Sequence, residues 1–379
     1  MKILASSAEV SAWSRALSGS LVVSLCALGL SFSACTKSED TGGGMGAATP
    51  AAPPETPRAS SQPDPGDDGP LTDPPAPPKA TGNPLQGLKL WVDPQNNAKL
   101  RANGIRSKSP DKAAILDKIG NQPQALWLGE WNTNIYRTAA FNVQKAKDEG
   151  AVAQFVAYNV PHRDCGQQSA GGLKTGDMYR HWIRRFAAGI GQEPVIVVLE
   201  PDAIPLLEKP NCLTKEQQDE RLALIKDAMR VLRQNPKAVV YLDAGHAHWD
   251  PAETFAPRLV KAGVAEAHGF ALNTSNYVST DENIAFGKKL SKLLGGSTHF
   301  IIDTSRNGNG STPDNQWCNP PGRKLGKAPT LDTGDPLIDG FLWMKRPGES
   351  DGADSPGQDC HGGPKAGVFW EEQAIEMAK

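Results

Sequence analysis

The sequence lacks a charge imbalance, closely spaced cysteine pairs and, over one long stretch, any aromatic residue. Its 40 Lys+Arg residues against 42 Asp+Glu residues leave a formal net charge of −2. A nucleic-acid-binding protein needs an excess of basic side chains to neutralise phosphates, so this balance argues against that class. Only six of the 379 residues are cysteines and no two form a CxxC pair, which argues against a zinc ribbon or a thioredoxin-type site.

The first residues indicate an export signal. Lys2 and Arg15 flank the start of an apolar run over residues 17–34, an arrangement typical of a secretory signal peptide. The run ends in Phe32-Ser33-Ala34-Cys35, which resembles a bacterial lipobox with cleavage before a lipidated Cys35. Because Phe32 replaces the usual Leu, ordinary signal-peptidase cleavage stays open, as does an uncleaved membrane anchor. All three alternatives predict an exported protein, either lipid-anchored at the outer cell surface or in the periplasm, or secreted.

Residues 35–85 have no aromatic side chain and are rich in proline. Twelve of the 31 prolines lie between residues 36 and 85. Such a segment buries too little apolar surface to offset the entropy lost on ordering. We therefore predict a disordered, extended linker between a signal peptide at 1–34 and one catalytic domain at 86–379.

Short apolar segments alternate with helical patterns throughout residues 86–379. In the clearest helical pattern, residues 215–233, apolar side chains recur at helical spacing and Pro236 follows the end. Continuous apolar strands separated by helices indicate a parallel sheet buried on both faces. We predict an α/β fold, a (β/α) barrel first and an open doubly wound sheet second. The predicted strands are 88–92, 125–128, 152–160, 195–199, 238–242, 270–272, 300–302 and 341–344.

Carboxylates, amides and aromatic residues follow these strands. Glu200-Pro201-Asp202 comes directly after residues 195–199, and Asp243 directly after residues 238–242. In a barrel the strand ends meet at the carboxyl-terminal face, where active sites lie. Carboxylates and amides accept hydrogen bonds from hydroxyl groups, and flat rings pack on sugars, so these residues suggest a carbohydrate site.

The strand-end motifs carry more information as an ordered set. They are Trp91-Val92-Asp93-Pro94, Tyr158 to Cys165, Glu200-Pro201-Asp202, Tyr241 to His246 with Trp249, Asn273 to Tyr277, Asp303 to Gly310, Trp317-Cys318, Thr333-Gly334-Asp335 and Lys345 to Gly352. In this order they resemble the family 6 glycoside hydrolases, the inverting endoglucanases and cellobiohydrolases that cleave β-1,4-glucan. The resemblance implies a distorted barrel of about seven parallel strands, a β-1,4-glucan polysaccharide partner, a monomer, and no cofactor or metal.

The resemblance assigns three aspartates to catalysis. Asp202 matches the general acid, which must keep its proton near neutral pH in order to donate it to the leaving oxygen. Asp164 matches the partner aspartate, whose charge raises that pKa and stabilises the oxocarbenium-like transition state. Asp351 matches the residue often proposed as base, with a water chain ending at a carboxylate as the rival scheme. A structural role, such as capping a helix, is the alternative for each aspartate.

Other positions match substrate contacts and supports of the site. Asp243 and His246 are predicted to support the barrel mouth. The predicted substrate contacts are Trp127, Tyr158, Trp249, Asn276, Trp317, Lys345 and Glu349. Core packing is the alternative for each tryptophan.

The resemblance also pairs Cys165 with Cys212 and Cys318 with Cys360. Each bond would close a loop of about 40–50 residues and stabilise the fold by ~3–4 kcal/mol. An exported protein keeps such bonds oxidised, and four free thiols are the alternative.

Two positions depart from the family pattern. Asp332 replaces the usual Asn before Thr-Gly-Asp. Ala170 follows Ser169 in the loop where the family often has a serine that positions the catalytic water.

The segments after Asp351 are short, which predicts an open cleft and an endoglucanase, with an exo-acting cellobiohydrolase as the alternative.

Two other classes of function are alternatives. A metal-dependent hydrolase would use His162, His246, His248 and Asp303, which provide few suitably spaced ligands for a metal site. A non-catalytic glucan-binding protein is the third alternative. It conflicts with the complete set of three aspartates.

Overall fold

The computed structural model describes residues 71–379. The predicted signal peptide, Cys35 and residues 36–70 of the predicted linker lie outside the described residues. Residues 71–80 have no regular secondary structure, and three of their carbonyls, those of Thr72, Pro75 and Pro78, accept hydrogen bonds from the globular part. Arg184 Nη2 donates to Thr72 O over 2.9 Å, and Arg233 Nη1 donates to Pro78 O over 3.0 Å. Among residues 71–379, no helix is both long enough and apolar enough to cross a membrane.

Seven strands form one sheet, and each strand pairs in parallel with the next in the sequence. The strands are β1 (Leu126–Leu128), β2 (Ala153–Ala157), β3 (Val195–Leu199), β4 (Ala238–Asp243), β5 (Gly269–Leu272), β6 (His299–Asp303) and β7 (Ile338–Leu342). The α/β fold with about seven parallel strands is thereby confirmed. The predicted strand at 88–92 is wrong, because only Leu90 forms an isolated parallel bridge there, to Val152.

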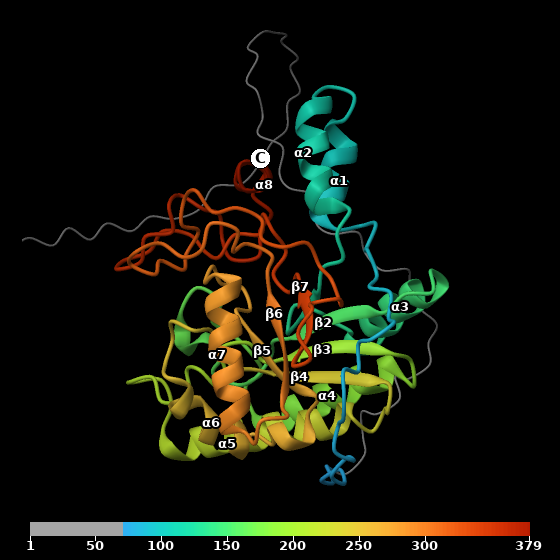
Figure 1. Cartoon of the computed structure of the whole chain (residues 1–379), viewed down its shortest axis with the longest axis vertical. Helices are drawn as coiled ribbons and strands as arrows, with labels where there is room; N and C mark the ends of the chain where they lie inside the picture. Colours follow the sequence, from blue (N-terminus) through green and yellow to red (C-terminus); the bar gives the residue numbers. More distant parts are fainter. Residues whose placement is uncertain (1–70) are drawn as a thin grey trace, which may run out of the picture. The chain divides into compact units, whose positions relative to one another are not determined.

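The sheet curls into a half-barrel (Figure 1), and its first and last strands do not pair with each other. Ala125 N, just before β1, donates to Trp343 O, just after β7, over 2.9 Å. Trp127 Nε1 donates to Met344 O over 2.7 Å. Leu85 is fully buried and packs with the side chains inside the barrel. The seam between β1 and β7 is therefore closed by a few bonds and by the segment that precedes β1.

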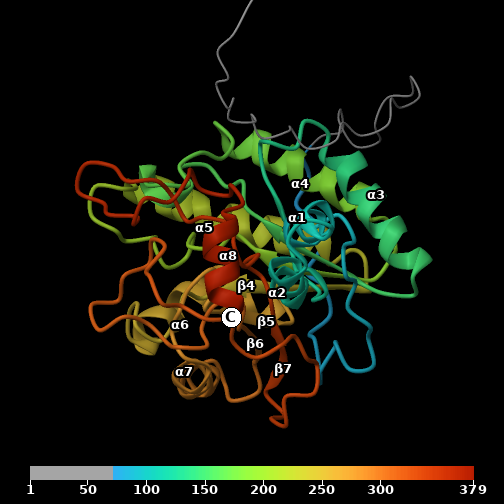
Figure 2. The same ribbon diagram turned by 90° about the horizontal axis from the view of Figure 1, so that it is seen from above.

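Alternate strand residues form two separate cores, because successive side chains of a strand point to opposite faces. Val156 and Val198 point into the barrel and pack there with Tyr241. Val197 and Phe270 point outward and pack against the helices. Helices α3 to α7 follow one another around the outside of the sheet (Figure 2). They are α3 (Ile135–Asp148), α4 (Gly176–Ile190), α5 (Lys215–Leu232), α6 (Ala252–Lys261) and α7 (Thr280–Leu293).

Local sequence explains where two of these helices begin. Thr214 accepts a hydrogen bond from Gln217 N and Gln217 bonds back to Thr214 N, which is a capping box at the start of α5. Ser279 and Glu282 form the same arrangement at the start of α7. Each box satisfies two backbone N–H groups that the helix itself leaves without partners.

The remaining helices and the longest irregular segments surround the end of the barrel. Helices α1 (Asn97–Ile105), α2 (Pro110–Gly120) and α8 (Glu371–Ala378) pack together around Trp343. The irregular segments 304–337 and 343–370, orange to red in Figure 1, lie next to α8. The predicted disulfides are confirmed, with Cys165 bonded to Cys212 and Cys318 bonded to Cys360.

Candidate active site

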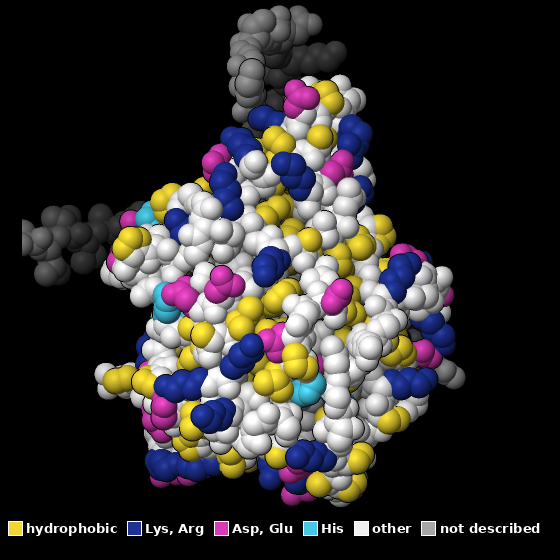
Figure 3. Space-filling view, in the orientation of Figure 1, with side chains coloured by type: hydrophobic (Ala, Val, Ile, Leu, Met, Phe, Trp, Pro, Cys, Tyr) yellow, Lys and Arg dark blue, Asp and Glu magenta, His cyan; other side chains and the backbone are white. Residues whose placement is uncertain are grey.

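A cleft of about 1140 Å³ lies at the carboxyl ends of the strands. Every residue that the sequence analysis proposed for catalysis or substrate contact lines this one cleft: Trp127, Tyr158, Asp164, Asp202, Trp249, Asn276, Trp317, Lys345, Glu349 and Asp351. On the face shown in Figure 3, Lys and Arg side chains are interspersed with Asp and Glu side chains. The cleft itself combines aromatic and carboxylate side chains.

Several residues at the strand ends hold backbone conformations that side chains rarely adopt. The φ angles are 57° at Asp164, 52° at Glu200, 67° at Asp202 and 64° at Asn273. Such conformations persist only where the surrounding structure enforces them, and they cluster at functional sites. Here they turn the chain sharply at the strand ends, directly beside the cleft.

The surroundings of Asp202 favour its protonated form. Burial raises the pKa of its carboxyl well above the usual value, and the nearby charges of Asp243 and Asp164 raise it further. Tyr158 Oη lies 3.4 Å from Asp202 Oδ2, and Lys345 exerts a weaker opposing effect. A carboxyl that keeps its proton at neutral pH is able to act as a general acid.

Asp243 is the stronger of the two charges acting on Asp202, whereas the sequence analysis had assigned this effect to Asp164. Asp243, the last residue of β4, is almost completely buried, and its Oδ1 accepts from Asp202 N over 3.1 Å. Burial raises the pKa of Asp243 to about 7. The two residues therefore form one acidic pair, in which Asp243 is buried and Asp202 is half-buried.

Asp164 organises the loop that follows β2. Its Oδ2 accepts from Ser169 N over 2.7 Å, and its Oδ1 from Gln167 Nε2 over 3.2 Å. Burial raises the pKa of Asp164, and the Ser169 N–H partly offsets that effect. Asp164 thus combines a half-buried position in the cleft with a raised affinity for a proton.

Asp351 has the opposite environment. Burial alone would raise its pKa, but Arg306 and Lys345 hold the pKa below its usual range. Arg306 Nη1 lies 2.9 Å from Asp351 Oδ1, and Lys345 Nζ lies 3.5 Å from the same oxygen. Tyr277 Oη and Asn319 N both donate to Oδ2, over 2.8 and 3.1 Å. Both oxygens of this carboxylate are therefore occupied by protein donors.

Glu200 connects the ends of β2 and β3. Its oxygens accept from Asn159 N and Val160 N over 2.9 and 3.0 Å, and Tyr179 Oη donates over 2.9 Å. The side chain is fully buried, and burial raises its pKa to about 7. The sequence analysis included Glu200 in a motif without giving it a role. The structure shows that it fixes the backbone from which the Asp164 loop departs.

The three predicted tryptophan contacts are partly buried walls of the cleft rather than core residues. Trp127 packs edge-on against Tyr158, with ring centroids 5.1 Å apart. Trp249 lies 5.2 Å from the ring of His246. Lys345 Nζ lies 5.9 Å from the Trp127 ring, so a cation and an aromatic face share one side of the cleft.

Two cleft residues escaped the sequence analysis. Trp131 is 50% exposed and lies over the guanidinium of Arg163, which is 5.3 Å from its ring. Arg163 itself is buried, forms a two-pronged ion pair with Glu130, and donates from Nε to Ser169 O over 2.8 Å. The order Gly-Glu-Trp after a predicted strand was the available signal for Trp131. The role of Arg163 depends on contacts that no local pattern encodes.

The histidines near the cleft do not converge. His246 lies in the cleft wall, where burial lowers its pKa to about 4, and its Nδ1 accepts from His248 N. His248 Nε2 faces Glu282 at 2.8 Å, and its Nδ1 faces Asn315 at 2.7 Å. Across residues 71–379, no group of three or more His, Cys, Asp or Glu side chains is arranged to hold a metal ion.

The two departures from the family pattern occupy different places. Asp332 is outside the cleft, where its backbone N donates to Thr330 Oγ1. Ser169 and Ala170 both line the cleft, so a serine hydroxyl is present one residue before the position in question.

Known proteins resemble this chain in sequence and fold. The profile described as Glycosyl hydrolases family 6 matches residues 85–379. Endoglucanase 1 of Streptomyces sp. (strain KSM-9) is 41% identical over 296 residues, which are 77% of this chain and 76% of that protein. Probable 1,4-beta-D-glucan cellobiohydrolase C of Aspergillus fumigatus (strain CBS 144.89 / FGSC A1163 / CEA10) is 30% identical over 346 residues, covering 77% of this chain and 76% of that protein.

A solved structure shows the same likeness. The endoglucanase Cel6 from Mycobacterium tuberculosis, in complex with methyl-cellobiosyl-4-deoxy-4-thio-β-D-cellobioside, is 42% identical with a TM-score of 0.72. The superposition covers 78% of this chain and 98% of that chain.

Proposed function

We propose, from the premise that the chain belongs to glycosyl hydrolase family 6 and is a cellulase of that family, that it cleaves β-1,4-glucan chains internally and with inversion. The observation that carries the proposal is the Asp202–Asp243 acidic pair at a cleft walled by tryptophans. A proton donor at neutral pH and flat surfaces for sugar rings are the two features that glucan hydrolysis requires.

In this mechanism Asp202 donates its proton to the glycosidic oxygen as the bond to that oxygen breaks. The positive charge that develops on the sugar is stabilised by nearby carboxylates, because opposite charges attract strongly in a site shielded from water. In this proposal Tyr158, whose Oη is 3.4 Å from the Asp202 carboxyl, contacts the same sugar. An inverting reaction then needs a second carboxylate to take a proton from the attacking water.

Asp164 fits the role of proton acceptor better than Asp351. The pKa of Asp164 is raised, whereas Arg306 and Lys345 keep that of Asp351 low, and a more basic carboxylate accepts a proton more readily. All the strong acceptor positions of Asp351 are already used by Arg306, Lys345, Tyr277 and Asn319. Asp351 acts instead by holding Lys345 and the segment after β7 in place.

Internal cleavage is favoured by the endoglucanase relatives at about 40% identity, with the cellobiohydrolases more distant at 30%. The short segments after Asp351 agree with this choice. A full-length preparation acting on soluble carboxymethylcellulose tests it when viscosity and reducing ends are followed together. Viscosity that collapses before many reducing ends appear supports internal cleavage, and reducing ends with little loss of viscosity would overturn it.

Asp202→Asn tests the chemistry in the same assay. We expect turnover to fall by about 10²–10⁴-fold, because the variant has no acidic proton, while binding of a soluble glucan persists. Unchanged turnover would remove Asp202 from the mechanism. Absence of turnover in the unaltered protein, with binding intact, would indicate a glucan-binding protein. The two base candidates are separated by adding azide, which restores turnover to Asp164→Ala only if Asp164 is the base.

A further inference from the structure

Residues 71–80, near the end of the predicted linker, contact the globular part with a period of three. The half-buried side chains recur at every third position, with two exposed residues between them: Leu71, Pro74, Pro77 and Ala80. The carbonyls that accept hydrogen bonds follow the same period: Thr72, Pro75 and Pro78. A polyproline-II helix has three residues per turn and no internal hydrogen bonds, so this pattern indicates such a helix with one face against the domain.

The sequence of this segment favours the polyproline-II conformation. Four of its ten residues are prolines, in the order Pro74-Pro75-Ala76-Pro77-Pro78. Proline fixes its own φ at about −65° and keeps the preceding residue extended. A segment that is already stiff loses little conformational freedom on docking, so a few hydrogen bonds are sufficient to hold it.

The first group of donors lies on α4 and is positioned by a buried carboxylate of α5. Asp227 accepts from Nη1 and Nη2 of Arg184 over 3.0 and 3.2 Å, and its Oδ1 lies 2.9 Å from Arg180 Nη1. Arg184 Nη2 also donates to Thr72 O over 2.9 Å. Arg180 Nη1 lies 3.5 Å from the exposed carboxylate of Asp73. Contacts within the globular part therefore orient both guanidinium groups toward the segment.

The second group of donors follows the end of α5. Arg233 Nη1 donates to the carbonyl of Glu266 and to Pro78 O, the latter over 3.0 Å. Gln234 Nε2 donates to a carbonyl of α5 over 3.1 Å and to Pro75 O over 3.3 Å. Each nitrogen carries two hydrogens, so one bond orients it and the other is available to the segment. The four side chains that contact the segment form the docking face: Arg180, Arg184, Arg233 and Gln234.

The docking face is separate from the cleft. Arg233 and Gln234 lie between α5 and β4, and the next residue, Asn235, donates from Nδ2 to Glu193 O over 2.7 Å, just before β3. These contacts place the two donors at the amino ends of the strands, whereas the cleft lies at the carboxyl ends. None of residues 71–80 lines the cleft.

We infer that the docking face is a recognition site for a polyproline-II segment and that its occupant in solution is residues 71–80 of the same chain. This inference is independent of the proposed function. It means that the linker is attached to the domain from residue 71 onward and that the attached part leaves the cleft free. Docking removes ten residues, roughly 30 Å of polyproline-II length, from the reach of the linker.

Trypsin cleavage after Lys79 tests whether the segment is docked in solution. Lys79 is exposed, but a protease binds its target in an extended form that has left the surface, so the rate reports the population of the undocked segment. We expect cleavage in the full chain to be at least about tenfold slower than in a synthetic peptide of residues 70–84. Mass analysis of the products measures both rates. Rates within about twofold of each other would overturn the inference.

Pro74→Ala and Pro75→Ala separate recognition of one face from the stiffness of the segment. Each variant removes one proline, but only Pro74 lies on the half-buried face. We expect Pro74→Ala to speed cleavage after Lys79 by about three- to tenfold and Pro75→Ala by less than about twofold. Cleavage after Arg58, which also lies between a proline and an alanine, is the reference for trypsin activity within each chain. Equal effects of the two variants would mean that stiffness alone matters and would overturn the inference.

Gln234→Ala tests the same contact from the helix side. It removes the donor to Pro75 O, so cleavage after Lys79 should become about threefold faster. Gln144→Ala is the matched control, because it removes an exposed glutamine of α3 whose amide donates to Asp148 Oδ1, and it should leave the rate unchanged. Circular dichroism of both variants checks that the helices are intact. An unchanged rate in an intact Gln234→Ala protein would overturn the role of the docking face.

Discussion

Two aspartates in one cleft have pKa values shifted in opposite directions, and their neighbours explain the difference. Asp202 lies next to two other carboxyls, Asp243 and Asp164, and its pKa is raised. Asp351 lies between Arg306 and Lys345, and its pKa is lowered. Burial acts in the same direction on both residues. The arrangement of charges around each carboxyl therefore decides which one keeps a proton.

The two regions also respond to pH with opposite sign. The folded state holds the Asp202 proton longer than the unfolded chain does, so the contribution of Asp202 to stability falls as pH rises above about 4. The contribution of Asp351 is present above about pH 4 and is lost as pH falls through its lowered folded-state pKa. Lowering the pH therefore removes the stabilising contribution of Asp351, while it favours the protonated form of Asp202.

The largest expected effect comes from removing the cation beside Asp351. Arg306→Met leaves a buried carboxylate without its main partner, which we expect to lower the free energy of unfolding by about 3–5 kcal/mol. Arg306 is fully buried, and it also donates to Ser275 O over 2.6 Å. Denaturant unfolding followed by tryptophan fluorescence measures the change.

An exposed ion pair is the control for this test, and a second substitution shows whether charge is the cause. Arg101→Met removes the partner of Glu371 at the surface, where we expect a loss of less than about 1 kcal/mol. Adding Asp351→Asn to Arg306→Met should recover about half of the loss or more, since the charge without a partner is then gone. Recovery of nothing would mean that Arg306 acts through packing on Tyr277 and that charge is secondary.

A smaller change is expected on the acid side. Asp243→Asn keeps an oxygen that accepts from Asp202 N but removes a negative charge, so the pKa of Asp202 should fall. Activity requires protonated Asp202, so the alkaline limb of kcat against pH should move to lower pH. Asp219→Asn, which removes an exposed charge on α5, should leave the limb in place. A shift of the limb to higher pH would contradict the assignment of Asp243 as the stronger charge.

The smallest expected effect is a change in KM on removing Trp131, a cleft residue that no sequence motif predicted. Trp131→Ala removes an exposed ring stacked on Arg163, and we expect KM for soluble glucan to rise about threefold, equal to roughly 0.5–1 kcal/mol, with kcat kept. Phe141→Ala, at a comparably exposed ring on α3, is the control. A fall in kcat without a change in KM would assign Trp131 to positioning Arg163 and would exclude a contact with substrate.

Regular patterns made much of the fold predictable. The continuous run at β3 and the helical spacing at α5 appear in the structure almost residue for residue. The last strand begins earlier than predicted, at Ile338, because Asp339 and Gly340 interrupt its apolar pattern. Asp339 is buried there all the same, since Tyr241 and His299 bond to it over 2.6 and 2.7 Å. When a buried polar residue is hydrogen-bonded by residues distant in the sequence, the local sequence pattern does not indicate its burial.

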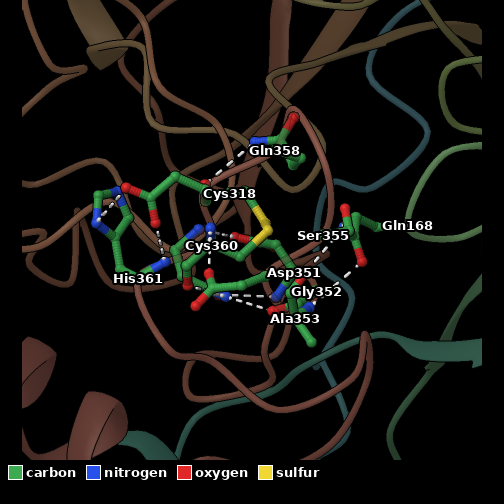
Figure 4. The surroundings of a disulfide bond; sticks show 12 residues. Gln168, Cys318, Asp351, Gly352, Ala353, Ser355, Gln358, Cys360 and His361 are labelled. Atoms are coloured by element: carbon green, nitrogen blue, oxygen red, sulfur yellow. Dashed lines mark hydrogen bonds and ion pairs between the residues drawn. A yellow bond between two sulfur atoms is a disulfide. The ribbon is translucent and has the colours of Figure 1, made fainter.

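The residues of the site were predictable from the sequence, but the contacts between them were less so. Strand ends and motif order placed Asp164, Asp202 and Asp351 together, because parallel strands deliver their carboxyl ends to one edge. The low pKa of Asp351 depends on Arg306, and Gln168 Nε2 donates to the carbonyl of Ala353, which lies 185 positions later (Figure 4). Such couplings arise from loop packing across the fold. The export signal and the lipidation of Cys35 stay predictions, as does the partition into domains.

The positions of the disulfides link the redox state of the chain to the geometry of the cleft. Cys165 directly follows Asp164, and Asn319, which binds the Asp351 carboxylate through its backbone, directly follows Cys318. Asn319 Nδ2 also donates to the carbonyl of Cys360. Each disulfide thus restrains the segment beside one candidate catalytic carboxylate. Reduction of both disulfides would remove these restraints, so the geometry of the cleft depends on the redox state of the four cysteines.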